Sequence, residues 1–310
     1  MSARSLRLVS LFACAALYAG SWPAWARSSP PPPSAKGATI TITVVNKKGE
    51  PPKVKQEDVQ LSQGKDRRQI ARWVKAERLY LAILIDDSLD SSAASQWTEL
   101  KQFIEAQPRS TAIAVGYASN GTVRVVQDFT NDHALAAKAL RIPLGTPGAF
   151  SSPYLSVIDW MKRWPSTGDR RSLLLISSGV DYFRGGFSPI YPDVDTAVSI
   201  AEKGNINLWS IYYPSASLRA RSFFRANTAQ NNLTKLSDES GGESFYLGTT
   251  APVSFKPYLD ELRVHLDNQY LLSFAGEGGA KGKFVSFRLK TELAHTEFLH
   301  ANQAWLPPAS

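Results

Sequence analysis

The sequence predicts an α/β protein with a doubly wound, mainly parallel central sheet and helices on both faces. A small β module formed from the N- and C-terminal segments accompanies it. Three observations predict this fold. Between residues 77 and 268, short apolar runs alternate with stretches of helical periodicity. The apolar runs are continuous, as is typical of strands buried on both faces of a sheet. At residues 38–76 and 269–310 the pattern changes to short strands and turns.

The first 26 residues have the order of a secretory signal peptide. Arg4 and Arg7 form a positive region, residues 8–19 are a short apolar stretch, and residues 24–26 are a small-x-small cleavage site. The apolar stretch is too short for a permanent membrane helix, and no later segment is long and apolar enough to cross a membrane. We therefore expect a secreted, periplasmic or cell-envelope protein that is cleaved near Ala26.

Composition excludes several kinds of function. The one cysteine, Cys14, lies in the segment expected to be removed, so we expect no disulfide, no cysteine-ligated zinc and no cysteine nucleophile. Removing Arg4 and Arg7 lowers the net charge from +8 to +6. The remaining charges are scattered, without a long block of one sign, which indicates a solvated basic surface and no nucleic-acid partner.

The segments before and after residues 77–268 are expected to be a linker and short β-strands. Residues 27–37 are a proline-rich linker. Residues 38–76 are the N-terminal β module, with a strand at 38–45, a turn at 46–49 and a hairpin of residues 59–62 and 69–74. Residues 269–310 are a C-terminal β-hairpin extension, in which strands 270–274 and 284–293 flank a glycine-rich turn. We expect this extension to join the N-terminal module.

The α/β domain itself is expected to span residues 77–268. Its expected strands are 79–85, 111–118, 122–129, 172–176, 206–213 and 244–247. Its expected helices are 93–106, 132–141, 153–164, 196–202, 227–240 and 254–268. Because parallel strands are joined by right-handed crossovers, these helices should coat both faces of the sheet.

An acidic turn follows the first buried strand, with the sequence Asp86-Asp87-Ser88-Leu89-Asp90. In open α/β sheets, ligands bind at the carboxyl ends of the strands. Carboxylates and hydroxyls on one tight turn are suitable ligands for a hard divalent cation such as Mg²⁺. Asp90 or Ser91 could instead cap the following helix, and both roles are compatible. We expect the turn to face solvent at the edge of the sheet.

The pattern Asp86-x-Ser88-x-Asp90 after a buried strand resembles the Asp-x-Ser-x-Ser metal-ion-dependent adhesion site of von Willebrand factor A (VWFA) domains. Segments 236–243 and 268–274 are similar to the exported "VWFA-related" proteins of Acidobacteria, and the resemblance extends from residue 38 to the C-terminus. It implies a vWA/Rossmann-like fold that binds a protein partner.

The resemblance also implies the residues of a Mg²⁺ site, with two departures from the family pattern. Asp90 stands where the family has its second serine, and Ser178 stands where it has an aspartate, so one anionic ligand is lost. Asp90 or Asp181 could restore the charge. Ser151 or Ser152, and less well Thr146, aligns with the threonine of the family. The candidate metal ligands are Asp86, Ser88, Asp90, Ser151, Ser152 and Ser178.

Two hypotheses therefore stay open. In the first, a degenerate Mg²⁺ site leaves one coordination position for a carboxylate of a partner protein. In the second, the chain is a metal-independent scaffold of the cell envelope that keeps only the fold.

Two further segments are candidate partner contacts near the same edge. Residues 183–192 form an aromatic loop, and exposed apolar loops often mark interfaces. Residues 218–225 are basic and aromatic, which suits an acidic partner. In the alternative interpretation of residues 218–225, the phenylalanines are buried and the arginines pair with neighbouring acids. The candidate contact residues are Phe183, Phe187, Tyr191, Arg219, Arg221 and Arg225.

Catalytic motifs are missing from the sequence. It contains no Gly-x-Ser-x-Gly and no His-Glu-x-x-His motif, and its four histidines are dispersed along the chain. We therefore expect a binding protein and not an enzyme. A hydrolase assembled from distant residues is the remaining alternative. The identity of the partner and the oligomeric state are not encoded in any motif.

Overall fold

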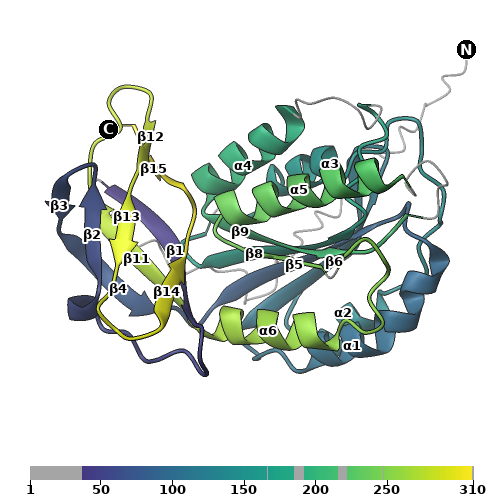
Figure 1. The fold of residues 1–310 in the computed structure, drawn as a ribbon, viewed down its shortest axis with the longest axis horizontal. Helices are drawn as coiled ribbons and strands as arrows, with labels where there is room; N and C mark the ends of the chain where they lie inside the picture. The colour runs from purple at the N-terminus through teal and green to yellow at the C-terminus, as the bar shows by residue number, and fades with distance from the viewer. Residues whose placement is uncertain (1–36, 166, 185–191, 216–221, 247, 309–310) are drawn as a thin grey trace, which may run out of the picture. The chain divides into compact units, whose positions relative to one another are not determined.

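In the computed structural model of the protein, the described residues are 37–165, 167–184, 192–215, 222–246 and 248–308 (Figure 1). The expected signal peptide and all but the last residue of the expected linker lie outside them. Residues 34–310 belong to one compact unit. Within the described residues, no helix has the length and apolar character needed to cross a bilayer.

The central sheet has six strands in the order β10-β9-β8-β5-β6-β7, all parallel except β7, which is antiparallel to β6. Every expected strand of the α/β domain is present, so the predicted mainly parallel sheet is confirmed. The strands are β5 (Leu79–Asp86), β6 (Thr111–Ser119), β7 (Thr122–Thr130), β8 (Arg170–Ser177), β9 (Ile206–Tyr212) and β10 (Ser244–Phe245).

Helices cover both faces of this sheet, as predicted (Figure 1). One face carries α1 (Trp97–Glu105), α2 (His133–Lys138) and α6 (Lys256–Asp267). The other carries α3 (Pro153–Met161), α4 (Pro192–Gly204) and α5 (Phe223–Glu239).

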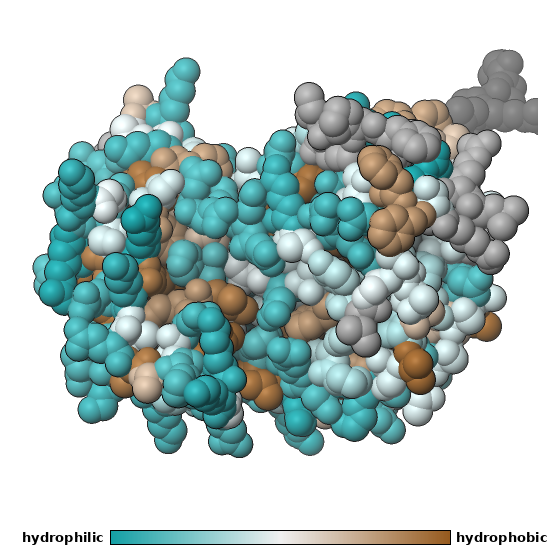
Figure 2. Space-filling view, in the orientation of Figure 1, coloured by the Kyte–Doolittle hydropathy of each residue, from teal (hydrophilic) through white to brown (hydrophobic). Residues whose placement is uncertain are grey.

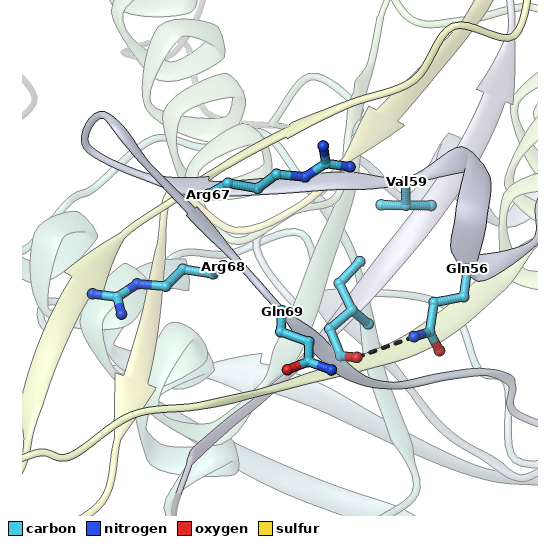
Figure 3. Close-up of a pocket in the computed structure, with 6 residues that line it drawn as sticks. Gln56, Val59, Arg67, Arg68 and Gln69 are labelled. Atoms are coloured by element: carbon cyan, nitrogen blue, oxygen red, sulfur yellow. Dashed lines mark hydrogen bonds between the residues drawn. The ribbon is translucent and has the colours of Figure 1, made fainter.

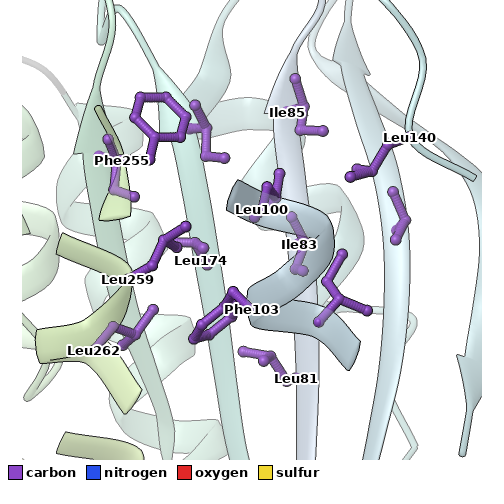
Figure 4. Close-up of a cluster of buried hydrophobic side chains, with 14 of the residues drawn as sticks. Leu81, Ile83, Ile85, Leu100, Phe103, Leu140, Leu174, Phe255, Leu259 and Leu262 are labelled. Carbon is purple, nitrogen blue, oxygen red and sulfur yellow. The ribbon is translucent and has the colours of Figure 1, made fainter. Parts of the chain in front are cut away.

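Each face has its own apolar core, because successive residues of a strand point to opposite sides. Leu81, Ile83 and Ile85 of β5 pack with α1 and α6, as Figure 4 shows. Ala82 and Leu84 belong to the core on the opposite face. The central strand is thus buried on both sides, which explains its continuous apolar sequence.

The ends of several helices differ from the prediction. The expected helix 93–106 is divided into a 3-10 helix, η3 (Ser91–Gln96), and α1. Helix α4 begins four residues earlier than expected, at Pro192, a residue whose fixed backbone angle suits the first turn of a helix. Helix α5 also begins earlier, at Phe223, so the end of the basic-aromatic segment is helical.

The terminal segments form three small sheets. β14 (Thr296–Leu299), β1 (Gly37–Asn46), β11 (Gln269–Ala275) and β4 (Ile70–Lys75) make the largest one, in this order. The second contains β13 (Arg288–Lys290), β2 (Gln60–Gln63) and β3 (Asp66–Arg68), and the third β12 (Lys283–Ser286) and β15 (Gln303–Leu306). A short 3-10 helix, η2 (Gln56–Asp58), precedes β2. The C-terminal segment therefore joins the N-terminal module, as predicted.

Two predicted hairpins of this module are wrong. Residues 284–293 do not pair with 270–274, because strand β11 lies between β1 and β4. The segment instead forms β12 and β13, which belong to different sheets. Phe287 separates the two strands and is buried against Phe274, with ring centroids 6.3 Å apart. Likewise, β2 pairs with β3, whereas β4 pairs with β11.

Candidate functional site

The acidic turn begins at the carboxyl end of β5, as predicted, and Asp86 is the last residue of that strand. Its Oδ1 accepts hydrogen bonds from the backbone N (2.9 Å) and the Oγ (2.7 Å) of Ser88. Its Oδ2 accepts one from the Oγ of Ser177 at the end of β8 (2.7 Å). The Oγ of Ser177 in turn accepts from the backbone N of Gly179 (2.9 Å). The Asp86 carboxylate thus links the turn after β5 to the end of β8 through hydrogen bonds.

The expectation that this turn faces solvent is wrong. Asp86 and Ser88 are each 2% exposed, and only Asp90 at the end of the turn is half-buried. Ser215, which follows β9, lies against the turn. Its Oγ donates to the carbonyl oxygen of Ser88 (3.0 Å), and Leu89 forms an antiparallel bridge with Ser215. Burial raises the pKa of Asp86, although its three hydrogen bonds oppose the shift.

Asp87, which the sequence analysis did not assign, has a charged partner of its own. Both of its carboxylate oxygens accept from Arg141, Oδ1 from Nη1 and Oδ2 from Nη2, each at 2.7 Å. Oδ1 also accepts from the backbone N of Leu144 (3.0 Å), and the Asp87 carbonyl accepts from Gly145 N (3.0 Å). Asp87 therefore holds the long connection between α2 and α3 against the edge of the sheet.

Asp90 caps the following helix, as the capping alternative predicts. Its Oδ1 accepts from the backbone N of Ser92 at 2.9 Å, at the start of η3. This contact satisfies one of the free N–H groups of the first turn.

Ser151 and Ser152 lie at the start of α3, next to the connection after β8. The Ser152 Oγ accepts from the backbone N of Leu155 (3.3 Å) and donates to Asp181 Oδ2 (3.0 Å). The carbonyl of Ser151 accepts from the backbone N of Tyr182 (2.9 Å) and of Phe183 (3.1 Å). Burial is the main cause of the raised pKa of Asp181.

Ser178 has a local role, since its Oγ accepts from the backbone N of Val180 at 3.4 Å. The candidate ligands thus lie at one edge of the sheet, in separate hydrogen-bonded groups. Among the described residues, the carboxylates of Asp86, Asp90 and Asp181 do not come within 4.8 Å of one another as a set of three. Mg²⁺ favours several oxygen ligands in a near-octahedral arrangement. Among the six candidate ligands, Asp86 supplies the one buried carboxylate, and both of its oxygens are already hydrogen-bonded.

The exposed apolar residues are concentrated at this edge. In the described part of the chain, eleven large hydrophobic side chains are exposed. Eight lie at the carboxyl edge of the sheet, in its connections or in the first turn of α5. We call these eight the carboxyl-edge surface: Ile142, Leu144, Phe150, Phe183, Phe223, Phe224, Tyr246 and Val253. Hydrophilic residues cover most of the face drawn in Figure 2.

Part of the carboxyl-edge surface is ordered by contacts between its own residues. The rings of Phe150 and Phe183 lie 5.9 Å apart between centroids. Arg184 lies with its guanidinium carbon 5.2 Å from the centroid of the Phe183 ring and binds both carboxylate oxygens of Asp193, at 2.9 and 3.1 Å. These contacts connect the segment after β8 with α4.

The two phenylalanines of the basic-aromatic segment, residues 218–225, are exposed. Phe223 and Phe224 are 74% and 68% exposed, so the interpretation with buried phenylalanines is wrong for both. Arg225 is half-buried in the first turn of α5. The other candidate contacts of this region, Phe187, Tyr191, Arg219 and Arg221, lie outside the described residues.

The described surface includes two open cavities of similar size. One, of about 430 Å³, adjoins the carboxyl-edge surface and is lined mainly by Tyr246, Pro252, Val253, Pro257 and Tyr258. The other, of about 410 Å³, lies in the β module (Figure 3). Its lining includes Arg67, Arg68 and Gln56, whose Nε2 donates to the carbonyl of Ile70 (3.0 Å). The first cavity extends the apolar surface at the edge of the sheet.

Comparison with known proteins finds several solved structures of low similarity. No family model and no curated protein matches the chain. Similar solved structures include the conserved hypothetical protein BatB from Bacteroides thetaiotaomicron (12% identity, 60% of this chain and 97% of that chain, TM-score 0.44). An aerotolerance-related membrane protein from Bacteroides fragilis has 12% identity over 61% of this chain and 98% of that chain, with a TM-score of 0.42.

A von Willebrand factor type A protein from Catenulispora acidiphila covers the largest share of this chain among these three. It has 11% identity over 89% of this chain and 75% of that chain, with a TM-score of 0.45. With identities of 11–12% and TM-scores below 0.5, the likeness of each structure to this chain is weak. At these values it carries no information about ligands or partners.

Proposed function

We propose that this chain is an exported interaction module that binds a protein partner through the carboxyl-edge surface and catalyses no reaction. The observation that carries the proposal is the gathering of eight of the eleven exposed large hydrophobic side chains at that one edge. Exposed apolar side chains scattered singly over a surface are normal, whereas their concentration in one region often marks an interaction site.

The chemistry of the surface suits a protein partner. Aromatic side chains are enriched at the centres of protein interfaces, where they contribute much of the binding free energy. Phe223 and Phe224 project from the first turn of α5, and Phe150 and Phe183 contact each other. Helix α5 and the ion pair between Arg184 and Asp193 hold these rings on ordered elements, which limits the entropy lost on binding.

The hydrogen bonds of the acidic turn support the metal-independent form of this module. Both oxygens of Asp86 accept hydrogen bonds within the chain, and Asp87 is neutralised by Arg141. In the metal-independent form, the acidic turn has a structural role. It holds in place the connections that carry the apolar residues of the carboxyl-edge surface.

The Mg²⁺-dependent form is the second candidate, favoured by the 2.7 Å contact between Asp86 Oδ1 and Ser88 Oγ, which places two oxygen ligands side by side. Asp86, Ser88 and Asp90 would hold the ion, which would supply a coordination position for a partner's carboxylate. Calorimetric titration of the purified chain with MgCl₂ distinguishes the two forms. Heat that disappears in Asp86→Ala favours the second form, and no heat at millimolar Mg²⁺ favours the first.

The binding surface is tested by substitution. The double variant Phe223→Ser and Phe224→Ser should fail to capture proteins that the parent chain captures from an envelope extract of its own organism. Leu135→Ser removes an exposed leucine of α2 that is not part of the carboxyl-edge surface, and it should capture the same proteins as the parent. Equal capture by all three chains would refute the assignment of the surface.

A further inference from the structure

A second group of titratable side chains lies on α6 and before β10, apart from the acidic turn. Glu261 and His265 are four residues apart on α6 and therefore lie on the same side of the helix. Glu243 directly precedes β10. The ligand atoms of all three lie within 4.8 Å of one another, and theirs is the one group of three or more such residues found in the described part of the chain.

The imidazole of His265 is fixed among aromatic rings. It stacks on Trp209, with 5.5 Å between ring centroids and an angle of 18°, and on Phe245, with 6.4 Å and 15°. Its side chain is 8% exposed, and the buried Nδ1 has no hydrogen-bond partner. The Nε2 points to the carboxylates, 3.1 Å from Glu243 Oε2 and 3.9 Å from Glu261 Oε1. The ring is thus held with one nitrogen directed at two acidic oxygens.

We propose that Glu243, Glu261 and His265 form a binding site for a divalent transition-metal ion, with Zn²⁺ as its best-matched representative. Zn²⁺ takes imidazole nitrogen and carboxylate oxygen at about 2.0–2.2 Å, so neighbouring ligand atoms of a tetrahedral site are about 3.3 Å apart. The separations of 3.1 and 3.9 Å from Nε2 bracket this value. The ligand oxygens of the two glutamates lie within 4.8 Å of each other, so both side chains would move closer together around a bound ion.

The surroundings suit a tetrahedral site with three protein ligands. The side chains of Glu243 and Glu261 are 40% and 54% exposed, so solvent reaches the fourth position. The chemistry argues against Mg²⁺ or Ca²⁺ here, because these ions prefer six or more oxygen ligands, whereas imidazole suits zinc and similar metals. The exported chain is expected to have no thiol, so the site relies on nitrogen and oxygen ligands alone.

Metal binding would connect two segments that are distant in sequence. Glu243 lies at the end of the α5–β10 connection, and α6 runs from the carboxyl edge towards β11. An ion shared between them stabilises the folded chain by mass action, because the unfolded chain does not hold the three ligands together.

The test is titration of the purified, tag-free chain with ZnCl₂, followed by calorimetry and by thermal unfolding. We expect one equivalent of Zn²⁺ to bind and the melting temperature to rise with Zn²⁺ concentration. Glu261→Gln and Glu243→Gln should each weaken Zn²⁺ binding by at least about tenfold, since even residues that only support ligands change metal affinity by about 10–100-fold. Both glutamates are partly exposed, so these variants should keep the fold in the absence of zinc.

Two controls make the result specific. Glu57→Gln and Glu50→Gln each remove an exposed glutamate outside the group. Both should bind Zn²⁺ with the affinity of the parent chain. The proposal is overturned if the parent binds no Zn²⁺ at millimolar concentration, in which case the three residues form only a hydrogen-bonded ion pair. It is also overturned if Zn²⁺ binding survives unchanged in both glutamate variants.

Discussion

The guanidinium of Arg141 binds both carboxylate oxygens of Asp87, with the two N–O distances equal at 2.7 Å. The guanidinium carbon also lies 3.8 Å from the centroid of the Tyr117 ring, and the Tyr117 hydroxyl accepts from the backbone N of Arg141 (2.6 Å). Three segments therefore meet at this pair: the end of β5, strand β6 and the connection after α2. That connection carries Ile142 and Leu144 of the carboxyl-edge surface.

Breaking this pair should destabilise the protein. Asp87→Asn leaves Arg141 without a full charge partner in a half-buried position, and we expect the free energy of unfolding to fall by about 2 kcal/mol. Urea denaturation measures it. Lys47→Met, which breaks an exposed ion pair with Glu297, should cost less than about 1 kcal/mol. Equal losses in the two variants would contradict a structural role for Asp87.

Gly179 should tolerate no side chain. Its φ is +66°, and an added Cβ would lie 2.8 Å from the carbonyl oxygen of Ala229 and 2.9 Å from Leu233 Cγ. We expect Gly179→Ala to lower the free energy of unfolding by about 2 kcal/mol or more, since strain and a clash act together. Gly168→Ala meets no atom within 4 Å and should be neutral or slightly stabilising. Thermal unfolding of the two variants compares them directly.

Glu202 should make stability depend on pH. Burial raises its pKa from 4.5 to about 7, with a smaller contribution from Glu239, although the hydrogen bond from the backbone N of Gln303 opposes the shift. The folded chain therefore holds this proton more tightly than the unfolded chain. By linkage, the stabilisation is complete below pH 4.5 and is lost as the pH rises towards about 7.

The variant Glu202→Gln isolates this effect, because glutamine keeps the acceptor oxygen for Gln303 and carries no charge. At pH 8 the variant should be more stable than the parent by about 1–2 kcal/mol, whereas at pH 4 the difference should vanish. Denaturant unfolding at both pH values gives the comparison. An offset that is the same at pH 4 and pH 8 would show that folding does not raise the pKa of Glu202.

Phe223 and Phe224 should contribute little to the stability of the isolated chain. Both rings are largely exposed, and surface substitutions away from special features change the free energy of unfolding by about 0.5 kcal/mol or less. The double serine variant should therefore unfold at nearly the same urea concentration as the parent. A loss several times larger would mean that the rings belong to the core of the protein and not to a binding surface.

The sequence predicts the central fold well because its signals are local. The run from Leu79 to Ile85 is apolar throughout, as is typical of a strand buried on both faces, and β8 and β9 contain similar runs. The capping role of Asp90 could also be predicted, since it depends on the residues directly after it.

The contacts that the sequence does not predict join residues far apart in the chain. The pairing of Asp87 with Arg141 spans 54 residues, and the bond from Ser177 to Asp86 spans 91. The strand partners of residues 284–293 depend on where Phe287 is buried. The spacing of apolar residues in the sequence does not predict this burial. The burial of the acidic turn likewise depends on the connection near Ser215.

Some features of the two proposed sites have a signal in the sequence. Ile142, Leu144 and Phe150 are apolar residues in a segment rich in glycine and proline, a combination that favours exposed apolar side chains in a connection. Glu261 and His265 stand four residues apart in an amphipathic helix, a spacing that brings two ligands to one side. Glu243, the third member, could be found only from the structure.

The central claim is that the carboxyl-edge surface contacts a protein partner, and site-specific photo-crosslinking in the native organism tests it most directly. A photoreactive phenylalanine analogue is placed at Phe224 or Phe183 in the surface, and at Leu135 outside it. We predict that irradiation yields one discrete adduct, identical from positions 224 and 183, and none from position 135. Adducts from position 135 alone, or no adduct from either surface position in cells that contain the folded protein, would contradict the account.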